Sequence, residues 1–282
     1  MASPATALTP ELTPSSKLKL DNVLYETRGT IAYVTVNRPE VLNALNGATW
    51  SDLRTAFEHA RDDELVRGVI LTGAGEKAFV AGADIGDLAK LSAVEAEQSS
   101  RFGQSVLDLI ENLGKPVVGA INGFALGGGL ETAMACTIRI CAEHAKFGQP
   151  EVHLGLLPGG GGTQRLPRLV GKGRALQLIL TGAMIGAAEA YRIGLVNEIV
   201  PAGDLIARAE AILNEIAANG PIAVRLALEA TNKGLETSQA DGLVLEASYF
   251  GLLAGTQDKK EGTRAFIEKR APRFAAWTGE EA

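Results

Sequence analysis

The sequence predicts an α/β fold followed by a helical C-terminal region, on the basis of two observations. Between Val23 and Cys141, short apolar segments of strand length alternate with segments whose apolar residues recur at helical spacing. From Lys172 onward, nearly every segment has the pattern of a helix. The 282 residues, 46% of them hydrophobic, suit one large domain, or a domain with an appendage, that buries a substantial core.

The expected elements begin with a pair of strands and a helix. Val23–Tyr25 and 31–36 look like strands on either side of a turn at Arg28-Gly29. Apolar residues at helical spacing predict a helix over 48–62. The order resembles ββα and recurs along the chain without an exact repeat. The other expected elements are strands over 66–72, 117–121 and 137–141, and helices over 94–113, 129–135, 172–180, 187–193, 203–218, 221–234, 238–254 and 258–269.

Three regions are expected along the chain. Residues 1–20 are rich in Pro, Ser and Thr and predict a disordered leader. Residues 21–200 form the α/β core, and a boundary around Pro201 separates it from a helical region over 201–282. The segment over 238–254 is strongly apolar, as expected for a helix that covers a subunit interface. Its apolar residues include Leu243, Leu245, Phe250, Leu252 and Leu253.

Composition argues against several classes of protein. A net charge of -6 disfavours nucleic acid or an anionic membrane surface as the main partner. No apolar run approaches the roughly 20 residues that a membrane span needs. Cys136 and Cys141 are too few for a disulfide framework and indicate a reducing compartment. The N-terminus lacks an apolar signal core and has no arginine before Arg28, so we expect a cytoplasmic protein.

Three motifs could carry chemistry, namely 81–85 (AGADI), 127–131 (GGGLE) and 149–165, which contains QPE and PGGGGTQR. A glycine triplet where a strand meets a helix exposes backbone N–H groups that suit a developing oxyanion. Gly128 and the small-residue turn at Ala83 could supply two such donors. Glu131 and Glu151 could supply the paired carboxylates that acid–base addition of water requires.

Other interpretations of these motifs are weaker or remain open. Residues 73–78 (GAGEKA) loosely match a dinucleotide fingerprint but lack the helix and the acidic residue that should follow. No P-loop and no G-x-S-x-G motif is present, and the three histidines lack metal-ligand spacing. Taken singly, the motifs could still be glycine-rich turns and two surface glutamates. Periodicity cannot place two glutamates twenty residues apart in one cleft.

From about Asp21 to Phe274 the chain resembles the crotonase (enoyl-CoA hydratase/isomerase) family. The matching stretches, in the family's order and spacing, are NRPEVLNALN, KAFVAGADI, KPVVGAINGFALGGGLE, FGQPEVHLGLLPGGGGTQRLPRLVG and GTRAFIEKR. The resemblance implies a crotonase-like right-handed spiral of ββα units. It also implies that the C-terminal helices support homotrimers, which pair into hexamers.

The resemblance also implies roles for individual residues. The N–H groups of Ala83 and Gly128 would form an oxyanion hole, Glu131 would take a proton from the attacking water, and Glu151 would protonate the α-carbon. Gln149 would orient Glu151, and the N–H of Gly159 would hold the water or a carboxylate. Gly160 departs from the family, which often carries Ala at that position. Residues matching substrate or coenzyme A contacts are Ala44 in the 41–45 loop, Ala81, Ala83, Asp84, Ile85, Gly128, Phe250, Phe266 and Lys269.

The function expected from the resemblance is that of an enoyl-CoA hydratase of the fatty acid β-oxidation type. Such an enzyme adds water reversibly and syn to trans-2-enoyl-CoA and gives 3-hydroxyacyl-CoA. It needs no metal and no cofactor, since coenzyme A is part of the acyl-CoA substrate. The alternatives are a Δ3,Δ2-enoyl-CoA isomerase, another crotonase-type CoA lyase and an RNA-binding homologue. Acyl chain length and pathway do not follow from the sequence.

Overall fold

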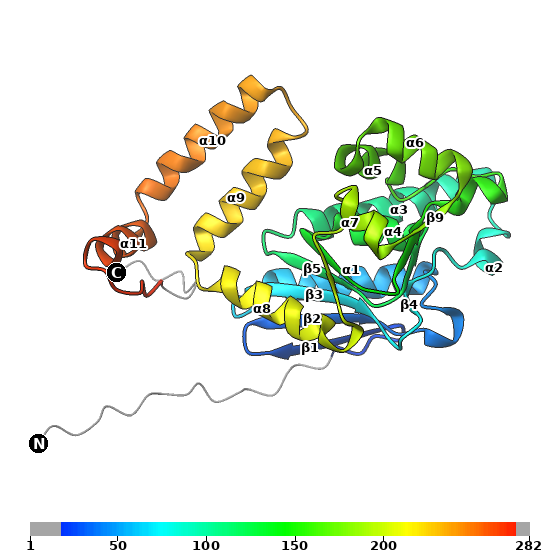
Figure 1. The fold of residues 1–282 in the computed structure, drawn as a ribbon, viewed down its shortest axis with the longest axis horizontal. Helices are drawn as coiled ribbons and strands as arrows, with labels where there is room; N and C mark the ends of the chain where they lie inside the picture. The colour runs from blue at the N-terminus through cyan, green and yellow to red at the C-terminus, as the bar shows by residue number, and fades with distance from the viewer. Residues whose placement is uncertain (1–17, 275–282) are drawn as a thin grey trace, which may run out of the picture.

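The computed structural model describes residues 18–274 and confirms the predicted α/β fold (Figure 1). Its strands form two sheets. The six-stranded sheet has the order β1 (Val23–Arg28), β2 (Ile31–Val36), β3 (Gly68–Gly73), β5 (Val117–Ile121), β7 (Ile138–Ala142) and β10 (Glu198–Val200). The four-stranded sheet has the order β4 (Ala78–Val80), β6 (Phe124–Leu126), β8 (Lys146–Gly148) and β9 (Met184–Gly186).

From β3 to β8, consecutive strands alternate between the two sheets. Each pair contributes one strand to each sheet, and a helix then leads to the next pair, which is the expected spiral of ββα units. Neighbouring strands are parallel, except for the β1–β2 hairpin and the β8–β9 pair. Because each crossover returns the chain to the same edge of a sheet, the turns that follow β4, β6 and β8 lie side by side.

Two long helices of the core begin at side-chain caps. The side chain of Asn46 accepts from Thr49 N at the start of α1, and Ser92 and Glu95 form a capping box at the start of α3. The helices up to β10 are α1 (Gly47–Asp62), α2 (Ile85–Leu88), α3 (Ala93–Glu111), α4 (Gly128–Ala135), α5 (Gly162–Val170), α6 (Lys172–Thr181) and α7 (Ala187–Arg192), with 3-10 turns η1 (Pro39–Val41) and η2 (Pro150–Leu154).

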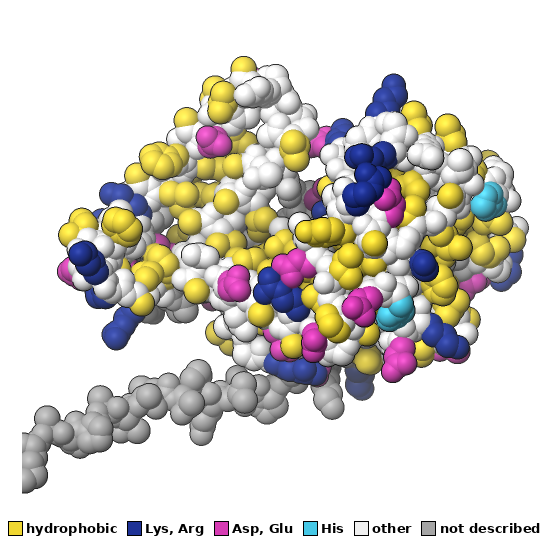
Figure 2. All heavy atoms as spheres, viewed as in Figure 1, with side chains coloured by type: hydrophobic (Ala, Val, Ile, Leu, Met, Phe, Trp, Pro, Cys, Tyr) yellow, Lys and Arg dark blue, Asp and Glu magenta, His cyan; other side chains and the backbone are white. Residues whose placement is uncertain are grey.

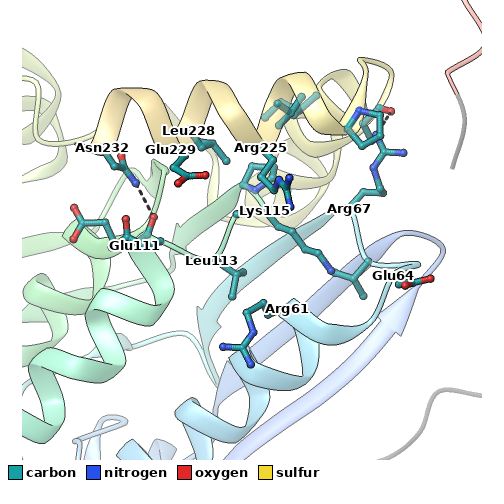
Figure 3. A pocket seen from close by; sticks show the side chains of 18 of the residues that line it. Arg61, Glu64, Arg67, Glu111, Leu113, Lys115, Arg225, Leu228, Glu229 and Asn232 are labelled. Atoms are coloured by element: carbon teal, nitrogen blue, oxygen red, sulfur yellow. Dashed lines mark hydrogen bonds between the residues drawn. The ribbon is translucent and has the colours of Figure 1, made fainter. Parts of the chain in front are cut away.

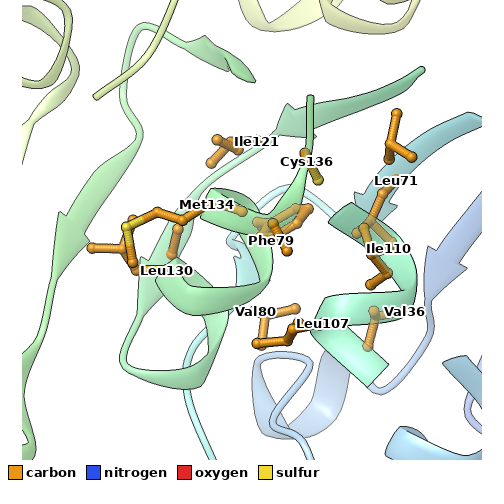
Figure 4. Packing of buried hydrophobic residues seen from close by; sticks show 14 of the residues in the cluster. Val36, Leu71, Phe79, Val80, Leu107, Ile110, Ile121, Leu130, Met134 and Cys136 are labelled. Carbon is orange, nitrogen blue, oxygen red and sulfur yellow. The ribbon is translucent and has the colours of Figure 1, made fainter. Parts of the chain in front are cut away.

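The packing of α4 against its neighbours fixes where the glycine triplet lies. Figure 4 shows Leu130 and Met134 of α4 in one apolar cluster with Leu107 and Ile110 of α3 and with Phe79 and Val80 of β4. A Cβ atom on Gly129 would lie 1.9 Å from the carbonyl oxygen of Val80. Glycine therefore lets the first turn of α4 rest directly on the backbone of β4.

Two strands interrupt the region after Lys172 that was predicted to be almost entirely helical. Both β9 and β10 are three residues long, as are β4, β6 and β8. Three residues are too few for an alternating pattern to show, so only pairing with neighbouring strands defines these elements. Met184–Gly186 pairs with β8, and Glu198–Val200 extends the large sheet beside β7.

The C-terminal helices follow η3 (Ala202–Asp204) and are α8 (Leu205–Ala217), α9 (Pro221–Gly234), α10 (Gln239–Ala254) and α11 (Gln257–Ile267). α8 packs on the six-stranded sheet through Leu205, Ala209, Ile212 and Leu213. The helices that stand away from both sheets are therefore α9 to α11 (Figure 1). Only Leu226 of α9 and Ala265 of α11 are buried, and α10 buries no residue.

The predicted leader lies mostly outside the described residues, which begin at Leu18. Leu18 and Leu20 already pack against the core. Within residues 18–274, no helix is both long and apolar enough to cross a membrane.

The close approach of α4 to β4 predicts that a side chain at Gly129 destabilises the fold. Gly129→Ala should lower the free energy of unfolding by about 3 kcal/mol, because the new methyl group overlaps a backbone oxygen that cannot rotate away. Urea denaturation measures the change. The control is Gly173→Ala in α6, which meets nothing within 4 Å and should be neutral or stabilising by about 0.5–1 kcal/mol. Equal stability of the two variants would show that α4 does not depend on this contact.

Candidate active site

The turn from β6 into α4 presents backbone N–H groups. Gly127 has φ 51° and ψ -125°, a conformation that favours glycine, and its own N–H donates to the Gly148 carbonyl at 2.9 Å. Gly128 is the first residue of α4, so its N–H has no acceptor within the helix. The helix dipole adds partial positive charge at this end. The Gly128 N–H can therefore bind an anionic or strongly polarised oxygen.

A second N–H group reaches the same place from the 81–85 loop. Leu45 and Ala83 form a parallel bridge, in which Leu45 N donates to Gly82 O and Asp84 N donates to Leu45 O, both at 2.8 Å. Since successive N–H groups of an extended segment point to opposite sides, the N–H of Ala83 points away from Leu45. Ala83 N is 3.9 Å from where a Cβ atom of Gly128 would lie. Ala83 and Gly128 are therefore adjacent donors.

The 41–45 loop is held rigidly against the 81–85 loop. Asn43 is fully buried and donates to the Ala74 and Ala78 carbonyls at 3.0 and 2.8 Å. Arg38 donates to Ala44 O at 2.5 Å and forms an ion pair with Asp84 at 3.2 Å. Ala44, Ala81 and Asp84, predicted to contact substrate, thus lie in two loops that are bonded to each other, and Ile85 beside them is exposed.

Glu131 is 3% exposed and points at the run of four glycines over 159–162, the glycine loop, which leads into α5. Its Oε1 accepts from the N–H groups of Gly160 and Gly162 at 2.8 and 2.7 Å. Burial raises the pKa of Glu131, while these two donors and the nearby Arg165 oppose the rise. No residue within 18–274 donates to the other oxygen, Oε2, so that oxygen can accept from water or a ligand.

Within this loop, glycine is needed most clearly at Gly162. A Cβ atom on Gly162 would lie 2.9 Å from the side-chain amide of Gln149 and 2.8 Å from Pro158 Cβ. One on Gly160 would lie 2.6 Å from Glu131 Oε2, so an alanine there would require the carboxylate to shift. Arg165 donates to Gly160 O at 3.0 Å and pairs with Asp108 and Glu111 of α3, both at 2.7 Å, which fixes the loop to the core.

Glu151 lies half-buried in η2, across the Gly127 turn. A Cβ atom on Gly127 would be 3.1 Å from Glu151 Oε1. Burial, with a smaller contribution from the charge of Glu131, raises the pKa of Glu151 to about 7. The fully buried Gln149 directs its amide nitrogen at both carboxylate oxygens, at 2.9 and 3.2 Å, in the orientation that satisfies both groups. Glu151 can therefore gain and lose a proton near neutral pH.

The structure brings together Ala83, Gly128, Glu131, Gln149 and Glu151, and it places Gly159 on the loop beside Glu131. It does not bring Phe250, Phe266 or Lys269 to this site, because they lie on or after α10 and α11, away from α4 (Figure 1). The sequence alone did not identify Gly160 and Gly162 as the hydrogen-bond donors to Glu131. The run of four glycines was visible in the sequence, but it does not say which N–H groups face a carboxylate.

A cavity of about 640 Å³ lies away from this site, beneath α9 (Figure 3). Asn232 of α9 donates to the Glu111 carbonyl at its edge, at 2.8 Å, and charged residues of both signs line it. The cavity lies between α9 and the core of the same chain.

Comparisons with known proteins agree on one family. The family model described as Enoyl-CoA hydratase/isomerase matches residues 26–277. A crotonyl-CoA hydratase of Syntrophomonas wolfei is 49% identical over 90% of this chain and 98% of its own length. A short-chain-enoyl-CoA hydratase of Clostridium acetobutylicum is 49% identical over 90% and 97%. The crystal structure of an enoyl-CoA hydratase from Bacillus anthracis has a TM-score of 0.87 at 42% identity and covers 90% of this chain and 99% of that one.

The raised pKa of Glu151 predicts a pH-dependent effect on stability. Between the ordinary carboxyl pKa of 4.5 and about 7, the unfolded chain loses this proton before the folded chain does, so stability falls as the pH rises. Glu151→Gln removes the penalty. It should raise the free energy of unfolding by about 1–2 kcal/mol more at about pH 8 than at about pH 4. Urea titrations at both pH values measure this difference, and the exposed Glu143→Gln should show none. A gain from Glu151→Gln that is the same at both pH values would contradict the pKa assignment.

Proposed function

The chain belongs to the enoyl-CoA hydratase/isomerase family, and from that premise we propose that it is an enoyl-CoA hydratase. It adds water reversibly and syn across the double bond of trans-2-enoyl-CoA to give 3-hydroxyacyl-CoA. The observation that carries the proposal is that two carboxyl groups, Glu131 and Glu151, flank the turn where Ala83 and Gly128 present free N–H groups.

The two N–H groups would bind the oxygen of the thioester carbonyl. Hydrogen bonds to that oxygen draw electrons from the conjugated double bond, so the β-carbon becomes electrophilic and the enolate that follows is stabilised. Removing one donor from a comparable oxyanion hole costs about 3–4 kcal/mol in activation free energy. Because both donors are backbone groups fixed by the Gly127 turn and the Leu45–Ala83 bridge, they need no rearrangement during the reaction.

Glu131 would act as the base for the attacking water. Its Oε1 is fully engaged by Gly160 and Gly162, which keeps the carboxylate oriented and favours its ionised form. Oε2 then accepts a hydrogen bond from water and takes its proton as the oxygen attacks the β-carbon. The N–H of Gly159, on the same loop, would help to hold that water.

Glu151 would deliver a proton to the α-carbon. With a pKa near 7, it is present in both protonation states around neutral pH, as a general acid requires. Gln149 would keep its carboxyl group turned towards the substrate. After the addition, Glu131 carries the proton taken from water and Glu151 is ionised. Glu131 would then lose its proton to solvent and Glu151 would take one from solvent before the next turnover.

The runner-up activity, migration of a double bond by a Δ3,Δ2-enoyl-CoA isomerase, needs proton transfer on carbon alone. One carboxyl group can do this. The presence of Glu131 with an oxygen free to bind water favours hydration over isomerisation.

The rest of the substrate and the assembly are part of the same proposal. The 41–45 and 81–85 loops would bind coenzyme A through Ala44, Ala81 and Asp84, and Phe250, Phe266 and Lys269 would close over it from a neighbouring subunit. Within the described residues, large apolar side chains are exposed along α10 and α11 (Figure 2), including Phe250 at 76% and Phe266 at 83%. A homotrimer, or a hexamer of two trimers, would bury them.

A cytoplasmic location also remains a proposal, supported by two free cysteines that are both buried.

The exposed face of α10 and α11 predicts an oligomer in solution. Multi-angle light scattering should give three or six times the chain mass of 29.5 kDa, because these helices bury too little surface to be stable alone. A monomer at working concentration would contradict this part of the proposal.

Replacing Glu131 and replacing Glu151 should have different effects on hydration and on exchange of the α-proton. Glu131→Gln should lower the hydration rate of crotonyl-CoA by about 10²–10⁴-fold, yet retain some exchange of the α-proton of bound acyl-CoA in deuterated water. Glu151→Gln should lose both hydration and exchange. Substrate affinity should survive in both variants, because neither change touches the backbone donors. The control is Glu143→Gln, which is exposed after β7. Hydration at the wild-type rate by Glu131→Gln would show that the two-glutamate mechanism is wrong.

A further inference from the structure

The peptide group between Gly159 and Gly160 links Glu131 to helix α3. Its N–H donates to Glu131 Oε1 at 2.8 Å. Its carbonyl oxygen accepts two hydrogen bonds, from Ser100 Oγ at 2.6 Å and from Gln104 Nε2 at 2.8 Å. Ser100 and Gln104 are one helical turn apart, so both face the loop from the same side of α3. Their two side chains also contact each other, with Gln104 Nε2 3.3 Å from Ser100 Oγ.

The hydroxyl group of Ser100 turns away from its own helix. Serine and threonine in helices of this chain commonly donate to the carbonyl four residues earlier, as Ser51, Thr231 and Ser248 do. Ser105, also on α3, donates to Phe102 O within the helix. Ser100 donates instead to a loop 59 residues away in the chain. The contact is therefore specific to the glycine loop and adds nothing to α3 itself.

Holding the carbonyl of a peptide also holds its N–H. The two groups lie in one plane and point in opposite directions, so a carbonyl fixed by α3 leaves the N–H aimed at Glu131. Donors on the carbonyl also polarise the peptide and make its N–H a stronger donor. Neither Gly159 nor Gly160 has a side chain that could fix this orientation, and glycine gives the loop more backbone freedom than any other residue would.

We propose that Ser100 and Gln104 are positioning residues for hydration, which act through the Gly159–Gly160 peptide to hold Glu131 with Oε2 turned to the attacking water. This inference rests on the proposed function. The other charged groups that face Glu131 are Glu151 of η2 and Arg165 of α5, and Arg165 is paired with Asp108 and Glu111 of α3. Arg165 donates to the next carbonyl of the loop, that of Gly160. Its contact with the loop is therefore separate from the contacts of Ser100 and Gln104 with the Gly159 carbonyl.

If Ser100 and Gln104 position Glu131, replacing them should change the pH dependence of activity, which a loss of protein stability alone would not do. Without the α3 donors, the Gly160 N–H stabilises the ionised carboxylate less, and the pKa of Glu131, already raised by burial, rises further. Because the base must be ionised, the acidic limb of the kcat/KM profile moves to higher pH. Binding of the thioester depends on Ala83 and Gly128, so the KM for crotonyl-CoA should change little.

The test uses the full chain with Ser100→Ala, Gln104→Met and the double variant. Each single change should lower kcat by about 3- to 10-fold, with KM within about 2-fold of wild type. The double variant should lose less than the product of the two, because both donors share one acceptor. Ser100→Thr, which keeps the hydroxyl, should restore kcat. Matched controls on exposed positions of α3 are Ser99→Ala and Gln98→Met, which should leave kcat and the pH profile unchanged.

A second readout does not depend on turnover. Infrared titration of the carboxyl groups, with Glu131→Gln as the difference reference, should show Glu131 titrating at higher pH in the Ser100 and Gln104 variants than in wild type. If wild-type protein does not hydrate crotonyl-CoA, the proposed function fails, whereas this titration still decides whether α3 acts on Glu131. Unchanged titration of Glu131, or a loss of kcat that is equal at every pH and not restored by Ser100→Thr, would overturn the inference.

Discussion

The buried carboxylate of Glu131 is the group on which the arrangement of the whole site depends. A charge held away from water is costly unless donors replace its lost hydration. Gly160 and Gly162 supply two such donors, and at Gly162 a side chain would crowd Pro158 and Gln149. A loop built of glycines must in turn be held, by Arg165 on one side and by α3 on the other. One carboxylate thus explains the glycine run and the polar side chains around it.

The second carboxyl group lies in a different environment. Glu131 is surrounded by donors that favour its ionised form, whereas Glu151 lies half-buried with a single amide neighbour and a negative charge nearby. Burial raises the pKa of both carboxyl groups, but only Glu131 has two backbone donors and a nearby arginine that oppose the rise, so the two groups can divide the roles of base and acid. The spiral fold makes this possible, since the turns after β4, β6 and β8 carry Ala83, Gly128 and Glu151 to one edge of the smaller sheet.

Sequence periodicity predicted the elements that are long enough to show a pattern, such as α1, α3 and the longer strands of the large sheet, but not β10 at its edge. It missed β4, β6 and β8, which are three residues long and carry the site, because pairing alone defines them. The residues of the site followed from the family resemblance, since no spacing rule brings Glu131 and Glu151 together. The donors from Gly160 and Gly162 could not be predicted, because which N–H faces a carboxylate depends on the path of a loop. The coenzyme A contacts at Phe250, Phe266 and Lys269 remain predictions that depend on a second subunit.

The most direct measurement is a crystal structure of the Glu131→Gln variant with crotonyl-CoA bound. We expect the thioester oxygen to lie about 3 Å from both Ala83 N and Gly128 N, with the double bond between the side chain of residue 131 and the Glu151 carboxyl group. A thioester oxygen bonded elsewhere, or a double bond out of reach of either side chain, would contradict the account.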